Sequence, residues 1–257
     1  RGIAPHWLKM ESNWQSLRGR ITHCPVDDDL RYTIIALRKM QLCGRSFGLR
    51  QTLGLLATLG PQQGSDATLP GRVACNLACG LQYPAAVRHA NTFREALGGQ
   101  IHCDLYGMVS PGAIEHAAQL AWHDAAAYSS ESGLYGGMWQ AACVAAAHAG
   151  LSPEAIIHAG LGQIPHNSRL ACALRATIAA WRAHPDDHDA TVADIERRTG
   201  HYHCIHAIPN CCLIGAALLH GNGDVSRTIC LAVMGGLDTD CNGANAGAIV
   251  GAAAGLA

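Results

Sequence analysis

Two acidic clusters carry the residue types that are best suited to chemistry in this sequence. The first comprises Asp27, Asp28 and Asp29, and the second is Asp238-Thr239-Asp240, which is followed by Cys241. Each cluster stands directly before a stretch with helical periodicity, so carboxylates from two helix starts can converge on one point. Converging carboxylates repel one another unless a cation lies between them, and such oxygen ligands suit hard ions such as Mg²⁺, Mn²⁺ or Ca²⁺. The two clusters therefore indicate a divalent-metal site.

A purely structural role for the same residues stays open at this point. Aspartate is a favoured N-cap residue, because its side chain accepts hydrogen bonds from the free N–H groups of the first helical turn. The positive end of the helix dipole also favours carboxylates there. Either cluster alone fits this interpretation, whereas two such clusters in one chain rich in small residues favour the metal site.

Helices are the elements that must position both clusters. Aromatic residues make up only 5% of the chain, so its core has to be built from Ala, Leu, Ile and Val, which suits closely packed helices. No reliable alternation of apolar and polar residues predicts a strand. The spacing of apolar residues and the capping residues predict helices at Asp28–Leu42, Gly112–Ala127 and Gly136–Ala149, from Ser152 onward, and at Ser168–Ala183, Pro209–Leu219, Asp224–Met234 and Cys241–Ala257.

Together these helices predict an all-α fold, a compact orthogonal multi-helix bundle. We expect one domain over residues 1–257, truncated at both ends, because the chain does not start with Met and stops inside a helical pattern. The stretches Thr58–Cys79 and Tyr83–Pro111 are predicted to be loops. In the last helix, glycine recurs every four residues from Gly243 to Gly255, which indicates either close packing or a backbone-lined ligand cleft.

Composition narrows the class of partner. Lys and Arg total 18 against 19 Asp and Glu, so we expect no broad basic surface for nucleic acid. No uninterrupted apolar run is long enough to predict a membrane span. The 12 cysteines are scattered through apolar runs, not polar loops, which indicates reduced thiols and a cytoplasmic location.

Two other constellations offer metal or nucleophile chemistry. His201, His203, Cys204 and His206 form a zinc-type set, although four ligands so close together, with no distant partner, are crowded. A cysteine nucleophile paired with a histidine is a further alternative in a chain with 12 Cys and 15 His, but no local motif selects one pair. Three tryptophans on predicted helices are expected in the core, namely Trp122, Trp139 and Trp181.

The order of motifs along the chain resembles the ADP-ribosylglycohydrolase family. Pro25–Thr33 resembles the family's N-terminal metal motif, an Asp pair that opens a helix, and Gly235–Ala244 resembles its C-terminal Asp-x-Asp metal motif. The resemblance extends from about Pro25 to the C-terminus, and the second metal motif is its most specific part. Further segments resemble bacterial members such as the dinitrogenase reductase-activating glycohydrolases, namely Phe93–Glu95, Gly99–Ile101, Asp104–Gly107, Ser110–Gly112, Ala121–Ala125 and Gly133–Gly136.

The resemblance implies a helical hydrolase that cleaves the glycosidic bond between ADP-ribose and an acceptor, which is a protein side chain or a small molecule. It implies one or two Mg²⁺ or Mn²⁺ ions, with Asp28 and Asp29 as the catalytic residues beside the metal. The metal ligands carried over to this sequence are Asp27, Asp28, Asp29, Asp238, Asp240 and Cys241.

The resemblance also implies a substrate-binding set. Its members are Gly99, Gln100, Gly133, Tyr135, Gly136 and Asn210. Gly98-Gly99 and Gly133–Gly137 are expected to form glycine-rich turns that cradle a pyrophosphate through backbone N–H groups.

Several positions depart from the family pattern. Cys241 stands where the family has a Thr ligand, and a thiol is a poor ligand for a hard ion. Leu30 replaces a Thr, His102 an Arg, Ser129 a His and Gly137 a Glu. These departures leave an alternative function, that of a catalytically weak or inactive relative that binds ADP-ribose-like ligands.

Overall fold

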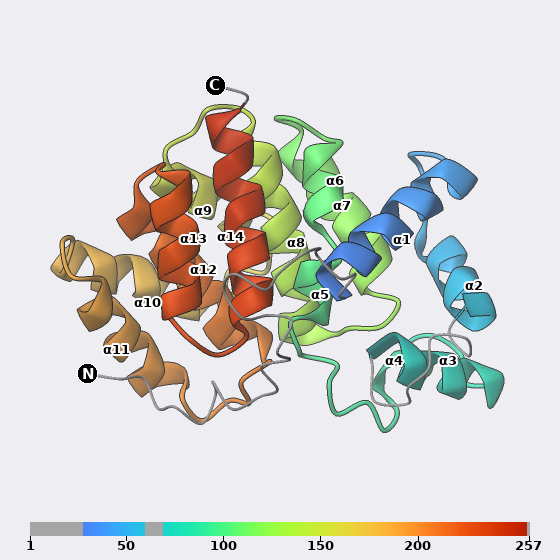
Figure 1. The fold of residues 1–257 in the computed structure, drawn as a ribbon. Coiled ribbons are helices and arrows are strands. Elements are labelled where there is room, and N and C mark those ends of the chain that lie inside the picture. Colours follow the sequence, from blue (N-terminus) through green and yellow to red (C-terminus); the bar gives the residue numbers. More distant parts are fainter. Residues whose placement is uncertain (1–27, 60–68, 256–257) are drawn as a thin grey trace, which may run out of the picture.

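The computed structural model describes residues 28–59 and 69–255, and every regular element in these ranges is a helix (Figure 1). The predicted all-α fold is therefore confirmed, and the strand-like pairing within the described ranges is a single antiparallel bridge between Ala96 and His206. The helices are α1 (Asp28–Cys43), α2 (Leu49–Leu59), α3 (Leu69–Ala78), α4 (Ala85–Arg88), α5 (Gly98–Ile101), α6 (Asp104–Met108), α7 (Ile114–Ala125), α8 (Glu131–Ala147), α9 (Pro153–Leu161), α10 (Arg169–Ala183), α11 (His188–Thr199), α12 (Ala207–Gly221), α13 (Val225–Met234) and α14 (Thr239–Ala254).

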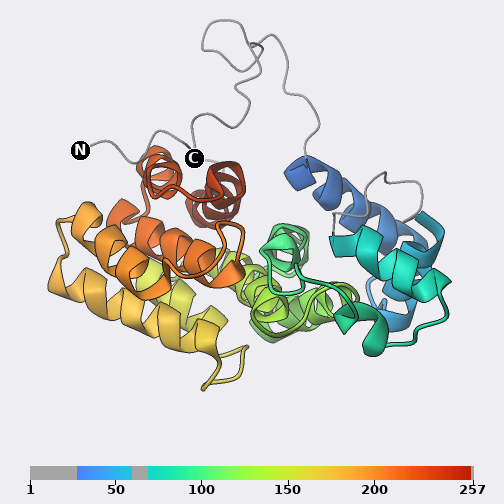
Figure 2. The same cartoon turned by 90° about the horizontal axis from the view of Figure 1, so that it is seen from below.

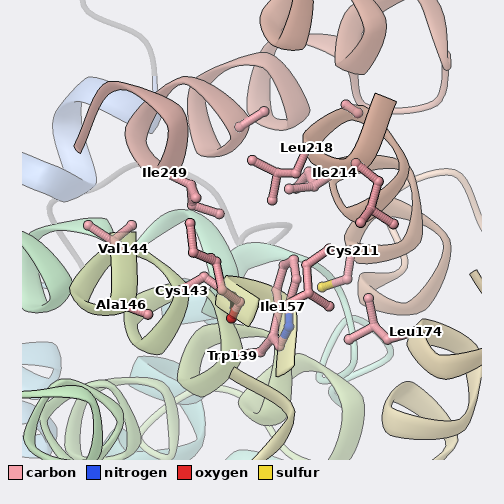
Figure 3. Packing of buried hydrophobic residues seen from close by; sticks show 14 of the residues in the cluster. Trp139, Cys143, Val144, Ala146, Ile157, Leu174, Cys211, Ile214, Leu218 and Ile249 are labelled. Carbon is pink, nitrogen blue, oxygen red and sulfur yellow. Dashed lines mark hydrogen bonds between the residues drawn. The ribbon is translucent and has the colours of Figure 1, made fainter. Parts of the chain in front are cut away.

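Helix α8 lies between two hydrophobic clusters. Trp139 and Cys143 face a cluster that α8 shares with α9, α10, α12 and α14 (Figure 3). Ala141 and Ala145 face a second cluster, formed with α1, α3, α4, α6 and α7. A helix that is buried on both sides is apolar all round, and small side chains let its neighbours approach closely, which explains the Ala-rich run Ala141–Ala147.

Helices α9, α10 and α13 begin where the sequence predicts, whereas α11 was not predicted and α12 and α14 begin two residues earlier than expected. Ser152, Ser168 and Asp224 each accept a hydrogen bond from a backbone N–H in the first turn of α9, α10 and α13. These bonds satisfy donors that a helix start would otherwise leave free. Every residue of α12 is buried, as its almost wholly apolar sequence requires.

The glycine stripe of α14 serves helix packing over part of its length. A Cβ atom at Gly243 would lie 3.1 Å from Val233 of α13, and one at Gly247 would lie 3.4 Å from Ile229. Gly251 has open space, and Gly255 follows the helix with a φ of +69°. Close packing is therefore the role of the first two glycines.

Several predictions of local structure are wrong. Helix α3 lies within Thr58–Cys79, which was predicted to be a loop, and Pro70 occupies its first turn, a position that proline tolerates. Tyr83–Pro111 is not one loop, because it contains the short helices α4, α5 and α6. Trp139 is fully buried, as predicted, but Trp122 and Trp181 are only partly buried.

Helices α1 to α4 pack together on one side of the molecule (Figure 2). A buried ion pair between Lys39 of α1 and Asp124 of α7 ties this group to the centre. His102, which follows α5, stacks on Tyr32 of α1 with ring centroids 3.6 Å apart. These contacts fix the direction of α1, whose first turn carries Asp28 and Asp29.

Two further features concern the described residues as a whole. None of the helices is long and apolar enough to cross a membrane. The eleven cysteines between residues 43 and 241 are free thiols.

Candidate functional site

The starts of α1 and α14 bring members of the two acidic clusters together. Asp29, in the first turn of α1, and Asp240 and Cys241, in the first turn of α14, place one carboxylate oxygen or sulfur each within 4.8 Å of the other two. Helix α5 packs against both α1 and α14 (Figure 1). Asp28 opens α1, but its side chain and the whole of Asp27 lie outside the described residues.

Like charges are crowded in this cluster. The pKa of Asp238 is raised to about 7, first by burial, then by the hydrogen bond and the charge of Asp240, with a smaller contribution from the charge of Asp29. A hydrogen bond to Cys241 opposes this rise in the pKa. A carboxylate whose pKa is raised by acidic neighbours belongs to a donor set that a divalent cation would stabilise.

Helix capping does not account for the side chain of Asp238. The residue occupies the N-cap of α14, yet its side chain makes no capping hydrogen bond. Asp187 and Asp224, at the same position of α11 and α13, do make one. The geometry therefore favours the metal-site interpretation of Asp238 over the capping interpretation.

A buried polar network lies next to the acidic cluster. Asp104 of α6 accepts hydrogen bonds from Gln140 Nε2 at 2.7 Å and from Asn245 Nδ2 at 2.8 Å. Asn245 in turn accepts a hydrogen bond from Gln100 Nε2 at 2.9 Å. Burial raises the pKa of Asp104 to about 7 against the effect of the two amide donors, and the charge of Asp29 adds to the rise.

Sequence reasoning did not assign a role to Asp104, Gln140 or Asn245. They lie on α6, α8 and α14, and no spacing along the chain relates residues that only tertiary packing brings together. A polar residue inside an apolar run was the available signal, because a buried polar group needs a partner. Gln140 and Asn245 both stand in such runs.

Two predicted substrate-binding residues are fully buried and already bonded. The Nε2 of Gln100 donates to Asn245, and its Oε1 accepts a hydrogen bond from the thiol of Cys211 at 2.9 Å. The amide of Asn210 is bonded on both of its polar atoms. In this arrangement both side chains link neighbouring helices next to the acidic cluster by hydrogen bonds.

The predicted glycine-rich turns are wrong, because both lie inside helices. A Cβ at Gly99 would lie 2.3 Å from the carbonyl oxygen of Gly133, and one at Gly137 would lie 2.5 Å from that of Gly99. These glycines therefore let α5 and α8 touch backbone to backbone. Gly136 is buried as well, but a Cβ there would meet its nearest atoms at 3.5 Å, which is an ordinary contact distance. Tyr135 is partly buried against the core.

The alternative constellations find no support. His203 Nδ1 accepts the N–H of Ile205, and His206 Nδ1 accepts that of Ile208 as an N-cap, so the two imidazoles serve the local backbone. Among the described residues, three potential metal ligands converge only at Asp29, Asp240 and Cys241.

A cysteine nucleophile paired with a histidine is not favoured by the thiols. Cys204 Sγ lies 3.6 Å from His203 Nδ1, but burial raises the pKa of this thiol. Burial raises the pKa of Cys143 and Cys211 well above the ordinary value of a thiol, which keeps both protonated and unreactive. Burial has the same effect on Cys212, whose pKa is about 11.

Comparison with known proteins places the chain in a family. A search of curated proteins finds no match. The family model described as ADP-ribosylglycohydrolase matches residues 17–257, which include both acidic clusters and every helix of the described residues. The chain therefore belongs to the ADP-ribosylglycohydrolase family.

Proposed function

We propose that this protein hydrolyses the glycosidic bond between ADP-ribose and an acceptor, and that it needs Mg²⁺ or Mn²⁺ to do so. The observation that carries the proposal is the convergence of Asp29, Asp240 and Cys241 from two distant parts of the chain, with Asp238 beside them. Membership of the family supplies the reaction class.

The residues present fit a hard divalent ion. Asp29, Asp238 and Asp240 offer the carboxylate oxygens that Mg²⁺ and Mn²⁺ prefer, and their mutual repulsion gives a cation a reason to bind. When bound, such an ion would polarise its oxygen ligands and neutralise negative charge at the site. Asp27 and Asp28 remain predicted ligands on the strength of the sequence.

The carboxylates would also handle the proton of the reaction. Asp28 and Asp29 are the proposed catalytic residues, because a carboxylate at this place can accept a proton from the water that attacks the anomeric carbon. The raised pKa of Asp238, about 7, makes the protonation state of the cluster sensitive to pH near neutrality. We therefore expect activity to rise with pH as Asp238 loses its proton.

The deciding experiment measures metal binding and product release in parallel. Titration calorimetry with MnCl₂ should give a chelator-sensitive signal, and ADP-ribosylated arginine and serine peptides should release ADP-ribose when Mn²⁺ is present. Asp238→Asn and Asp240→Asn should each lower the rate on the order of 100-fold or more, because they remove ligands of the ion.

Asp189→Asn is the matched control. Asp189 also lies in the first turn of a helix, α11, but its side chain is 95% exposed and lies outside the acidic cluster. This variant should keep full activity. Full activity of both cluster variants, or activity that survives a chelator, would disprove the metal-dependent mechanism.

A second candidate function rests on Cys241. Its side chain is only 3% exposed, and it puts a soft thiol among hard oxygen donors, which weakens the fit for one of two ions. The alternative is a protein that binds ADP-ribose-like ligands with little turnover. Cys241→Thr distinguishes the two: a gain in Mn²⁺ affinity and hydrolysis would identify a weakened enzyme, and an active wild-type protein without such a gain would reject the alternative.

A further inference from the structure

The turn that delivers Asp238 has a sterically disfavoured backbone. Between α13 and α14, Gly236 has a φ of +83° and Leu237 has a φ of +61°. Glycine adopts such values freely, but a leucine in the left-handed region brings its Cβ too close to the following carbonyl oxygen. A conformation of this kind persists only where its surroundings hold it.

The side-chain amide of Asn210 is hydrogen-bonded to this turn. Its Oδ1 accepts a hydrogen bond from the backbone N–H of Asp238 at 3.3 Å and another from Asn242 Nδ2 at 2.8 Å. Asn242 Nδ2 also lies 3.4 Å from the carbonyl oxygen of Gly236, to which it donates. The two amides therefore span the turn on both sides of Leu237.

The same amide is anchored to a different part of the chain. Asn210 Nδ2 donates to the carbonyl oxygens of Cys204 at 2.7 Å and His206 at 2.8 Å, in the segment that leads into α12. Asn210 is fully buried in the first turn of α12. This set of bonds needs one side chain that both donates and accepts hydrogen bonds. A carboxylate cannot donate and an aliphatic side chain can neither donate nor accept, so a carboxamide is required.

We infer that Asn210 is a positioning residue, which clamps the Gly235–Asp238 turn so that Asp238 and Asp240 are held opposite Asp29. The role differs from the substrate contact that the sequence predicts for Asn210, because both polar atoms of its amide are occupied. The consequence for metal affinity rests on the proposed function. The consequence for the turn itself does not.

The test compares Asn210→Leu with the wild-type protein in two measurements. Hydrogen exchange should become about tenfold faster at the Asp238 amide and its neighbours, because the bonds that close the turn are lost. The affinity for Mn²⁺ should fall about 10- to 100-fold, as expected when a residue that orients metal ligands is removed.

Asn76→Leu is the matched control for a general loss of stability. Asn76 is also buried, and its Nδ2 likewise donates to two backbone carbonyl oxygens, those of Ala86 and His89. This variant should leave both the exchange of the turn and the Mn²⁺ affinity unchanged. A loss of affinity as large as that of Asn210→Leu would overturn the inference.

Asn242→Ala keeps the test decisive if Asn210→Leu does not fold. It removes the amide that bridges Asn210 and Gly236 but leaves the bonds of Asn210 to Cys204 and His206, so we expect the same effects in smaller size. Unchanged exchange at Asp238 in a folded variant overturns the clamp whether or not the protein binds Mn²⁺. A wild-type protein that binds no Mn²⁺ but shows faster exchange in the variants keeps the clamp and rejects the proposed metal function.

Discussion

Asp124 is buried and Asp238 is half-buried, and the two regions that hold them treat their aspartates in opposite ways. Between α1 and α7, Asp124 forms an ion pair with Lys39 and accepts a hydrogen bond from Tyr128 Oη at 2.9 Å. At the start of α14, Asp238 lies beside Asp240 and feels the charge of Asp29. The first region supplies its own counter-charge, and the second gathers charge of one sign.

The two environments move the carboxyl pKa values in opposite directions. Burial alone would raise the pKa of Asp124, but the charge of Lys39 and the interaction with His102 hold it well below its usual range. Burial and neighbouring acids raise the pKa of Asp238 to about 7. An aspartate with its own lysine serves to fix helices in place, whereas an aspartate among other acids is suited to bind a cation from solution.

The largest loss of stability is expected from Lys39→Met. The substitution leaves Asp124 buried without its partner, which costs about 3–5 kcal/mol of the free energy of unfolding. Urea unfolding of both proteins measures this. The control is Arg182→Met, which breaks an ion pair with Glu154 in which Arg182 is 62% exposed and should cost less than about 1 kcal/mol. Similar losses in the two variants would mean that the buried pair does not hold α1 in place.

A smaller effect, on the pH dependence of stability, is expected from Asp104→Asn. The folded pKa of about 7 lies above the ordinary value of 3.8, so between these values the folded state keeps a proton that the unfolded state has released. Stability therefore falls as pH rises from 5 to 7, by about 2 kcal/mol from this group. Unfolding curves at both pH values should show that the fall is smaller in the variant by this amount. An equal fall in both proteins would show that Asp104 is ionised throughout.

The smallest effect on stability is expected from Asp238→Asn in the metal-free protein. Unlike Lys39→Met, this substitution should stabilise the protein. Removing one of several like charges should raise the free energy of unfolding at pH 7.5 by about 1 kcal/mol, and no capping bond is lost. The variant should also lose any increase in melting temperature that Mn²⁺ gives the wild-type protein. A destabilised variant would show that Asp238 has a structural role like that of Asp124.

The sequence by itself predicts the helices that follow ordinary rules. Ser152, Ser168 and Asp224 mark helix starts because capping is a local interaction, fully encoded within a few residues. Local rules mislead where glycine or proline serves another purpose. Gly99 and Gly133 indicate a turn on their own, but in the structure they allow α5 and α8 to touch.

The same division applies to the candidate site. The acidic motifs and their resemblance to a family select Asp29, Asp238 and Asp240 from the sequence alone, because these motifs are short and specific. Only the tertiary structure decides that Asp104 joins Gln140 and Asn245 beside them, and that Asn210 closes the turn of Asp238. These partners lie on separate helices, and the hydrogen bonds between them depend on how those helices pack, which no local pattern of residues records.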